Sequence, residues 1–303
     1  MIFAEILPML PIIAVGYFFK KKGILPEYAP VVLNKILFNF VVPILVLGAF
    51  AKIEITTDIV LLPLAGVIAA LLFLIIGIGI GNILIKKQKT RASFVIAFSC
   101  FEGGTITYPL VSIAFGAMGL SRAVLYDFGL GLILVTILYA LAQYYGEEKS
   151  KLNLANAGCA LKQLTKSPII WGIATGIIFN LLNVQGAFFD NLYKIVGGSI
   201  LVLAMLLIGL ELNPSIKSLQ LVLATMVLKM IVGLGVALLI SLVFGFTELE
   251  KNVVLIATTV PASFLALIYA RENNLDTEFT ASLLSISYPV SIVVLSFLIN
   301  YLL

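Results

Sequence analysis

Apolar runs, each about the length of a bilayer-spanning helix, follow one another along the whole of this 303-residue chain. With 61% apolar and 11% charged residues, a soluble fold would expose an aggregation-prone surface. We therefore predict an all-α polytopic membrane protein with ten transmembrane helices, numbered one to ten. They lie near residues 2–20, 30–50, 58–85, 91–117, 120–145, 165–183, 187–212, 218–246, 249–271 and 277–302.

The basic residues separate by loop. Most of them, including Lys20 and Lys86, fall in loops on one side of the predicted topology, and only Lys52, Arg122 and Lys251 fall on the other. Short cytoplasmic loops carry the excess of Lys and Arg, so we expect the lysine-rich side to be cytoplasmic and both termini to lie outside. No organelle address is apparent, which favours the cell (plasma) membrane. The basic residues form no stripe, so the lipid bilayer and not nucleic acid is the expected partner.

The chain divides into two halves of five predicted helices. Residues 1–145 form the first half, a cytoplasmic linker spans 146–166, and residues 167–303 form the second half. Because five is odd, the halves have opposite topology, which is the inverted repeat on which many carriers are built. A short recurrence supports it: Pro11-Ile12-Ile13 returns as Pro168-Ile169-Ile170.

The fourth helix of each half is interrupted in mid-span by proline with small or hydroxyl residues around it. The two segments run from Gly103 to Pro109 and from Thr258 to Ser263. Proline removes an amide donor and paired glycines lower helix stability, so we expect both helices to be broken. Unwound backbone in a bilayer must line a polar cavity or be buried in protein. Broken ends offer amides to anions and carbonyls to cations, which predicts a carrier site.

Three ionisable residues fall within predicted helices. Glu102 lies 11 residues after Arg91, or roughly 16 Å at the helical rise. A carboxyl at that depth indicates a proton or sodium site; the alternative is a buried carboxyl permanently tied to a neighbour. Lys229 is expected at a similar depth on helix eight, so we predict a Glu102–Lys229 pair; a permanently fixed counter-charge is the alternative. Asp127, five residues after Arg122, is expected near the outer end of helix five, where solvent or an interfacial partner could also satisfy it.

Several stretches together resemble the auxin efflux carrier family, the PIN-like carriers of the bile acid and arsenite transporter superfamily. They are Leu33-Asn34-Lys35 to Val42-Pro43, Gly103-Gly104 through Pro109 with Gly116 and Gly119-Leu120, Tyr126-Asp127, and Ile208-Gly209-Leu210. The resemblance covers essentially the whole chain. One departure concerns Glu102, because the family commonly has an amide, typically Asn, at that position.

The resemblance implies two inverted five-helix repeats, with helices 4 and 9 broken and crossing at the midplane. Helices 1, 2, 6 and 7 would form a scaffold, through which the protein would dimerise, and helices 3–5 and 8–10 would form a moving transport unit. Family members carry organic anions, so a small carboxylate is the implied substrate. Some relatives in the superfamily are coupled to sodium.

The residues and the resemblance give one candidate site at the crossing. The expected substrate-binding residues are Asn34, Gly103, Gly104, Thr105, Pro109, Thr259, Val260, Pro261 and Ser263, and the expected ion-coupling residues are Glu102, Lys229 and Asp127. The hydroxyl groups could instead repair backbone groups freed by proline, and Asn34 could simply join helices.

We therefore expect a secondary active transporter that moves a small organic anion by alternating access, with protonation of Glu102 as the favoured coupling step. A sodium-coupled symporter, or a channel or sensor with the same fold, is the alternative. The chain has no histidine, which excludes His-based catalytic triads and the H-E-x-x-H metal motif. We expect no enzyme activity, no metal and no cofactor other than H⁺ or Na⁺ as a coupling ion.

Overall fold

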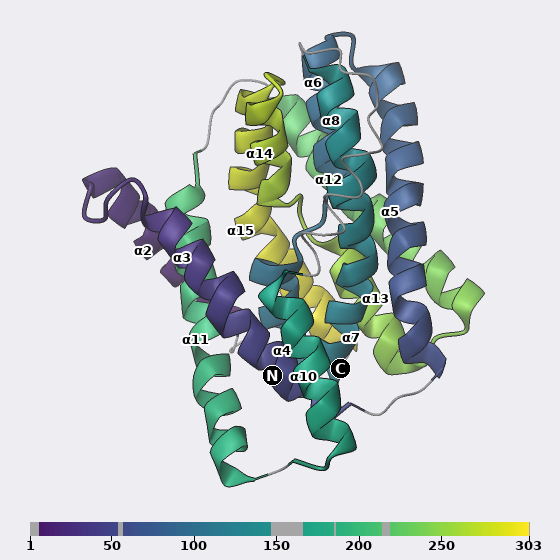
Figure 1. Ribbon diagram of the computed structural model, residues 1–303. Coiled ribbons are helices and arrows are strands. Elements are labelled where there is room, and N and C mark those ends of the chain that lie inside the picture. The colour runs from purple at the N-terminus through teal and green to yellow at the C-terminus, as the bar shows by residue number, and fades with distance from the viewer. Residues whose placement is uncertain (1–5, 54–56, 147–165, 185, 214–218, 303) are drawn as a thin grey trace.

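The computed structural model describes residues 6–53, 57–146, 166–184, 186–213 and 219–302, and within these ranges it is helical without any strand. Its elements, shown in Figure 1, are α2 (Met9–Lys22), α3 (Ala29–Ile36), η1 (Leu37–Val41), α4 (Val42–Phe50), α5 (Thr57–Leu84), α6 (Gln88–Ser99), η2 (Gly103–Thr107), α7 (Tyr108–Ile133), η3 (Leu134–Leu138), α8 (Tyr139–Tyr145), α10 (Pro168–Leu181), α11 (Ala187–Glu211), α12 (Leu219–Phe244), α13 (Glu248–Thr259), α14 (Phe264–Glu272) and α15 (Thr277–Leu302). The three η segments are π-helical turns that continue into α-helices. The all-α prediction is confirmed.

Seven helical stretches of the described residues are long and apolar enough to cross a membrane. One of them, Gly103–Tyr145, contains a sharp bend at Gly116, where φ is 61° and ψ is −153°. That left-handed φ strains any residue with a side chain, which accounts for glycine there. The helices α2 and α10 are shorter, with 14 described residues each. Most of the predicted linker 146–166 lies outside the described residues.

Large apolar side chains cover the outer surface of these helices. Ile83 on α5 is 82% exposed and Leu242 on α12 is 81% exposed, values that would favour aggregation in water but suit contact with lipid. The polar side chains Thr258 and Ser291, by contrast, are completely buried. The distribution of exposed and buried groups therefore fits a protein whose solvent is the bilayer.

Two sets of helices pack through glycines. On one side α2 packs against α11, where Gly16 and Gly209 meet, and α4 packs against α10. On the other side α5 packs against α7, and α12 packs against α13, where Gly233 meets the backbone of Thr258. A side chain at any of these glycines would overlap the opposite backbone, so the small residues allow the close helix approach that is common in membranes.

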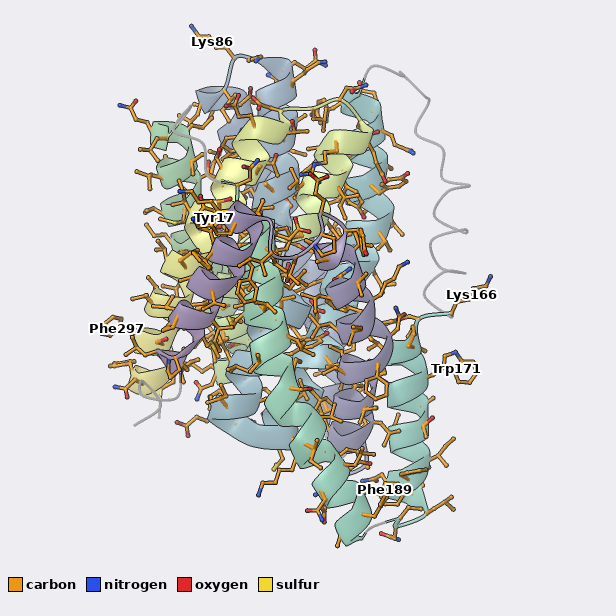
Figure 2. All side chains as sticks on the ribbon, turned by 90° about the vertical axis from the view of Figure 1, so that its left-hand side faces the viewer. Tyr17, Lys86, Lys166, Trp171, Phe189 and Phe297 are labelled. Carbon is orange, nitrogen blue, oxygen red and sulfur yellow. The ribbon has the colours of Figure 1, made fainter. Side chains whose placement is uncertain are left out.

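The two sets extend in opposite directions along the molecule. In Figure 1 the connection between α10 and α11 lies at the bottom, whereas the turn between α5 and α6 lies at the top. Figure 2 shows the same offset, with Phe189 at one end and Lys86 at the opposite end. We call the first set the α2–α11 group; it consists of α2, α3, η1, α4, α10 and α11. The second set, the α5–α15 group, consists of α5–α8 and α12–α15. The two groups contact each other where α4 packs against α7, α11 against η2, and α2 against α15.

Candidate transport site at two interrupted helices

Both predicted helices are interrupted, but the first break lies at Cys100–Glu102, just before the predicted segment from Gly103 to Pro109, which is itself helical. The helix α6 ends at Ser99, and the chain is extended at Cys100 and Glu102 before η2 begins. The helix α13 ends at Thr259, Val260 is extended, and α14 begins at Phe264. The two gaps touch, because the Glu102 amide donates to the Pro261 carbonyl over 3.2 Å. Backbone freed by one break is thus partly satisfied by the other.

The Glu102 carboxylate lies on the first residues of two helical segments at once. Its Oε1 accepts from the Thr105 amide (3.2 Å) and hydroxyl (2.7 Å). Its Oε2 accepts from the Phe264 amide at the start of α14 (3.3 Å) and from the Tyr288 hydroxyl (2.9 Å). The side chain is buried. Helix N-termini attract anions through their free amides and the helix dipole, so Glu102 occupies a place suited to a carboxylate.

Lys229 is buried on α12 but does not pair with Glu102, so that prediction is wrong. Its Nζ donates to the carbonyls of Phe98 (2.6 Å) and Cys100 (2.8 Å) at the end of α6. The ammonium also lies 4.2 Å from the centre of the Phe101 ring. Residues at equal depth can face different directions around a helix, and here Lys229 faces the carbonyl end of the break while Glu102 faces the amide ends.

Asp127 joins the site, contrary to the expectation of a position near the outer end of helix five. Its carboxylate accepts from the Tyr108 hydroxyl over 2.7 Å and lies against the Cα of Gly103, where a side chain would overlap it. The depth was misjudged because it was counted from Arg122. That residue is no interfacial loop residue: it is buried in α7 and forms an ion pair with the buried Glu250 of α13.

The α2–α11 group reaches the site through Phe38 and not through Asn34. The Phe38 ring of η1 lies so close to Gly104 that a side chain there would overlap it. Asn34 is exposed on α3, and among the described residues no side-chain hydrogen bond joins it to either interruption. A role for Asn34 in substrate binding stays a prediction.

The remaining candidate residues are buried at the two interruptions: Thr105, Pro109, Thr259, Val260, Pro261 and Ser263. Thr259 donates to the Leu255 carbonyl one turn back, and Ser263 accepts from the Leu265 amide as the N-cap of α14. Thr258 likewise bonds to the Val254 carbonyl and to the Tyr126 hydroxyl. The hydroxyls of Thr258, Thr259 and Ser263 bond to nearby backbone groups, which fits the alternative to a substrate-binding role, whereas the Thr105 hydroxyl contacts the Glu102 carboxylate.

Tyr288 is a site residue that the sequence reasoning missed. It lies on α15 before Pro289, its hydroxyl donates to Glu102, and its ring stacks on Phe264 with 4.8 Å between centres. A signal was available, because Ile286-Ser287-Tyr288-Pro289 repeats the pattern Ile106-Thr107-Tyr108-Pro109. Each tyrosine of this repeated pattern donates to a carboxylate of the site.

A cavity of about 510 Å³ opens at the ends of α2, α11 and α14, and four of its lining residues are charged: Lys20, Glu27, Glu211 and Arg271. Lys20 also donates to the Leu212 carbonyl over 2.7 Å. Arg271 is near the end of α14, whose first residue donates to Glu102. Seven residues at the helical rise separate them by roughly 10 Å, so the cavity lies about two turns of α14 from the carboxylate.

Sequence comparisons cover nearly the full length of the chain. Residues 1–299 match the profile of the family described as membrane transport protein. A protein of Methanothermobacter thermautotrophicus named uncharacterized transporter is 27% identical over 299 residues, which are 95% of this chain and 94% of the relative. An uncharacterized transporter of Methanocaldococcus jannaschii is also 27% identical, over 304 residues and 96% of each chain.

Proposed function

The chain belongs to the membrane transport protein family, and on that premise we propose that it is a secondary carrier that moves a small organic anion by alternating access. Membership makes the protein a multi-pass membrane transporter and not an enzyme. The substrate, the coupling ion and the mechanism are our proposal, and they rest on the geometry around Glu102.

The proposed topology has ten membrane passes in two inverted repeats. The bend at Gly116 divides one of the seven long stretches into two passes, and the shorter helices α2 and α10 supply the other two. In this arrangement α6 with η2 and the start of α7 forms the fourth pass, α13 with α14 forms the ninth, and the two cross at the contact between Glu102 and Pro261. The α2–α11 group is the scaffold and the α5–α15 group is the moving unit.

The observation that carries the proposal is the position of the Glu102 carboxylate on two helix N-termini. Donors arranged in this way suit any carboxylate, so a substrate anion and an ionised Glu102 compete for the same groups. A second carboxylate, Asp127, touches the neighbouring Gly103. An anionic substrate would add a third negative charge unless a proton arrives with it. We therefore favour a cycle in which Glu102 takes up a proton and releases the donors to the substrate. The loaded site then carries no more negative charge than the empty one, and the proton and the substrate anion are carried together as a neutral pair.

The charged cavity at the ends of α2, α11 and α14 is the proposed entrance to this site. Its residues Lys20 and Arg271 can bind an anion, although Glu27 and Glu211 in the same lining balance their charge. By the loop charges, this end with Lys20 and Lys86 faces the cytoplasm, in the cell membrane, and both termini face outward. The proposed homodimer forms through the scaffold helices, as the resemblance to auxin efflux carriers implies; exposed apolar residues there, such as Phe40 and Trp171, suit contact with lipid as well as with a second copy.

A thermal-shift screen followed by flux measurement tests the proposal. Purified protein is screened against small carboxylates at several pH values and sodium concentrations, because a ligand that binds the native state raises its melting temperature. A carboxylate found this way is then labelled and tested for counterflow in proteoliposomes. Saturable counterflow supports a carrier; conductance at channel rates contradicts it.

A further inference from the structure

The ammonium of Lys229 lies in a site built like that of a bound cation. The side chain is 2% exposed, and two backbone carbonyls at the end of α6 accept from it over 2.6 and 2.8 Å. Three aromatic rings surround it, with their centres 4.2 Å (Phe101), 5.1 Å (Phe73) and 5.9 Å (Phe98) from Nζ. Among the described residues no carboxylate forms an ion pair with it.

A buried ammonium without an ion-pair partner needs other groups to offset its lost hydration. The carbonyls at the C-terminal end of α6 carry the negative end of the helix dipole, and the faces of desolvated aromatic rings attract a cation. In other carriers, carbonyls at broken helix ends coordinate a transported ion such as Na⁺. Here the same kind of group holds a covalently attached cation.

We propose that Lys229 is a built-in cation that fills the cation position of the crossover, so that transport needs neither Na⁺ nor K⁺. Lys229 neutralises the carbonyl end of α6, and Glu102 neutralises the amide ends of η2 and α14. The interrupted segment from Phe98 to Gly103 is thus charge-matched at both ends by the chain itself. Lys229 is a positioning residue in this account, since it fixes the end of α6 from which the chain turns to Glu102.

The test is to empty this position and offer free cations. Lys229→Ala removes the atoms of n-propylammonium, so the purified variant is melted with n-propylammonium, Na⁺, K⁺ or bulky choline chloride at equal ionic strength. The expected result is a lower melting temperature without a fitting cation and a saturable rise with n-propylammonium, with Na⁺ or K⁺ giving a smaller rise than the amine. Thr225→Ala is the matched control, because Thr225 is buried on the same helix but bonds only within it, to the Leu221 carbonyl. No cation should stabilise that control beyond the effect of choline.

A folded Lys229→Ala protein whose melting temperature no small cation raises would overturn the proposal. If that variant does not fold, the wild-type protein still decides the question, because its melting temperature should be the same in sodium, potassium and choline chloride. A saturable stabilisation of the wild type by Na⁺ that choline does not reproduce would show that a free cation, and not Lys229, completes the crossover. Neither measurement depends on the identity of the carried substrate.

Discussion

The Glu102 carboxylate should be the chief bond between the two interrupted helices, and its removal should be measurable without a known substrate. In Glu102→Ala, the amides of Thr105 and Phe264 lose their acceptor. The hydroxyls of Thr105 and Tyr288 can rotate toward other acceptors, but the two amides cannot. A buried donor left without an acceptor costs about 1–3 kcal/mol, so the two amides together should cost about 2–6 kcal/mol.

Glu102→Gln should lower the free energy of unfolding by only about half as much as Glu102→Ala. The amide oxygen can still accept from Thr105, and the amide nitrogen can donate to the Tyr288 hydroxyl, which can also act as an acceptor. Only the Phe264 amide then faces another donor, a loss of about 1–3 kcal/mol. The expected order of melting temperature is therefore wild type, then Glu102→Gln, then Glu102→Ala.

Acetate provides the decisive control, because it has the atoms that Glu102→Ala removes. Acetate at constant ionic strength should stabilise Glu102→Ala saturably, relative to chloride, and more than it stabilises the wild type, in which Glu102 already holds the donors. This role of Glu102 is refuted if Glu102→Ala has the melting temperature of the wild type, or if acetate stabilises both proteins equally.

Two further predictions concern the packing around the site. Arg122→Ala should lower the free energy of unfolding by about 3–5 kcal/mol, because it leaves the Glu250 carboxyl without its ion-pair partner in the interior. The control Lys52→Ala removes an exposed ion pair and should cost less than about 1 kcal/mol. Equal losses for the two variants in reversible unfolding would contradict this. Gly209→Ala should lower the free energy of unfolding by about 1–3 kcal/mol, because the added methyl group overlaps α2. The control Gly198→Ala on the same helix places the methyl group in open space and should leave the stability unchanged. Matching melting temperatures for the two variants would show that the close contact is not needed.

The helices could be predicted from sequence because in a bilayer each apolar run must satisfy its own backbone as a helix. The interruptions could be predicted for the same local reason: Pro109, Pro261 and the Gly103–Gly104 pair act on the backbone where they stand. The second break, after Thr259, falls just before Pro261. The first, after Ser99, falls just before the glycine pair, whereas Pro109 lies in the first turn of α7 and does not interrupt the helix.

The partners within the site could not be predicted from helix periodicity. Counting residues along a helix gives depth, so Glu102 and Lys229 were placed level, but it does not give the direction in which each side chain points. The count for Asp127 failed because Arg122, its reference, is itself buried against Glu250. Tyr288 was missed because its serine- and proline-containing helix, α15, reads as an ordinary apolar span, and its role depends on a contact 186 residues away.

In the proposed cycle, a proton on Glu102 accompanies the substrate anion through the crossover. This coupling is tested most directly by uptake of the labelled carboxylate into proteoliposomes, with and without an inward proton gradient, for the wild type and Glu102→Gln. We expect the wild type to accumulate substrate in response to the gradient, and Glu102→Gln to support at most counterflow without accumulation. A Glu102→Gln protein that accumulates substrate with full dependence on the proton gradient would contradict the account.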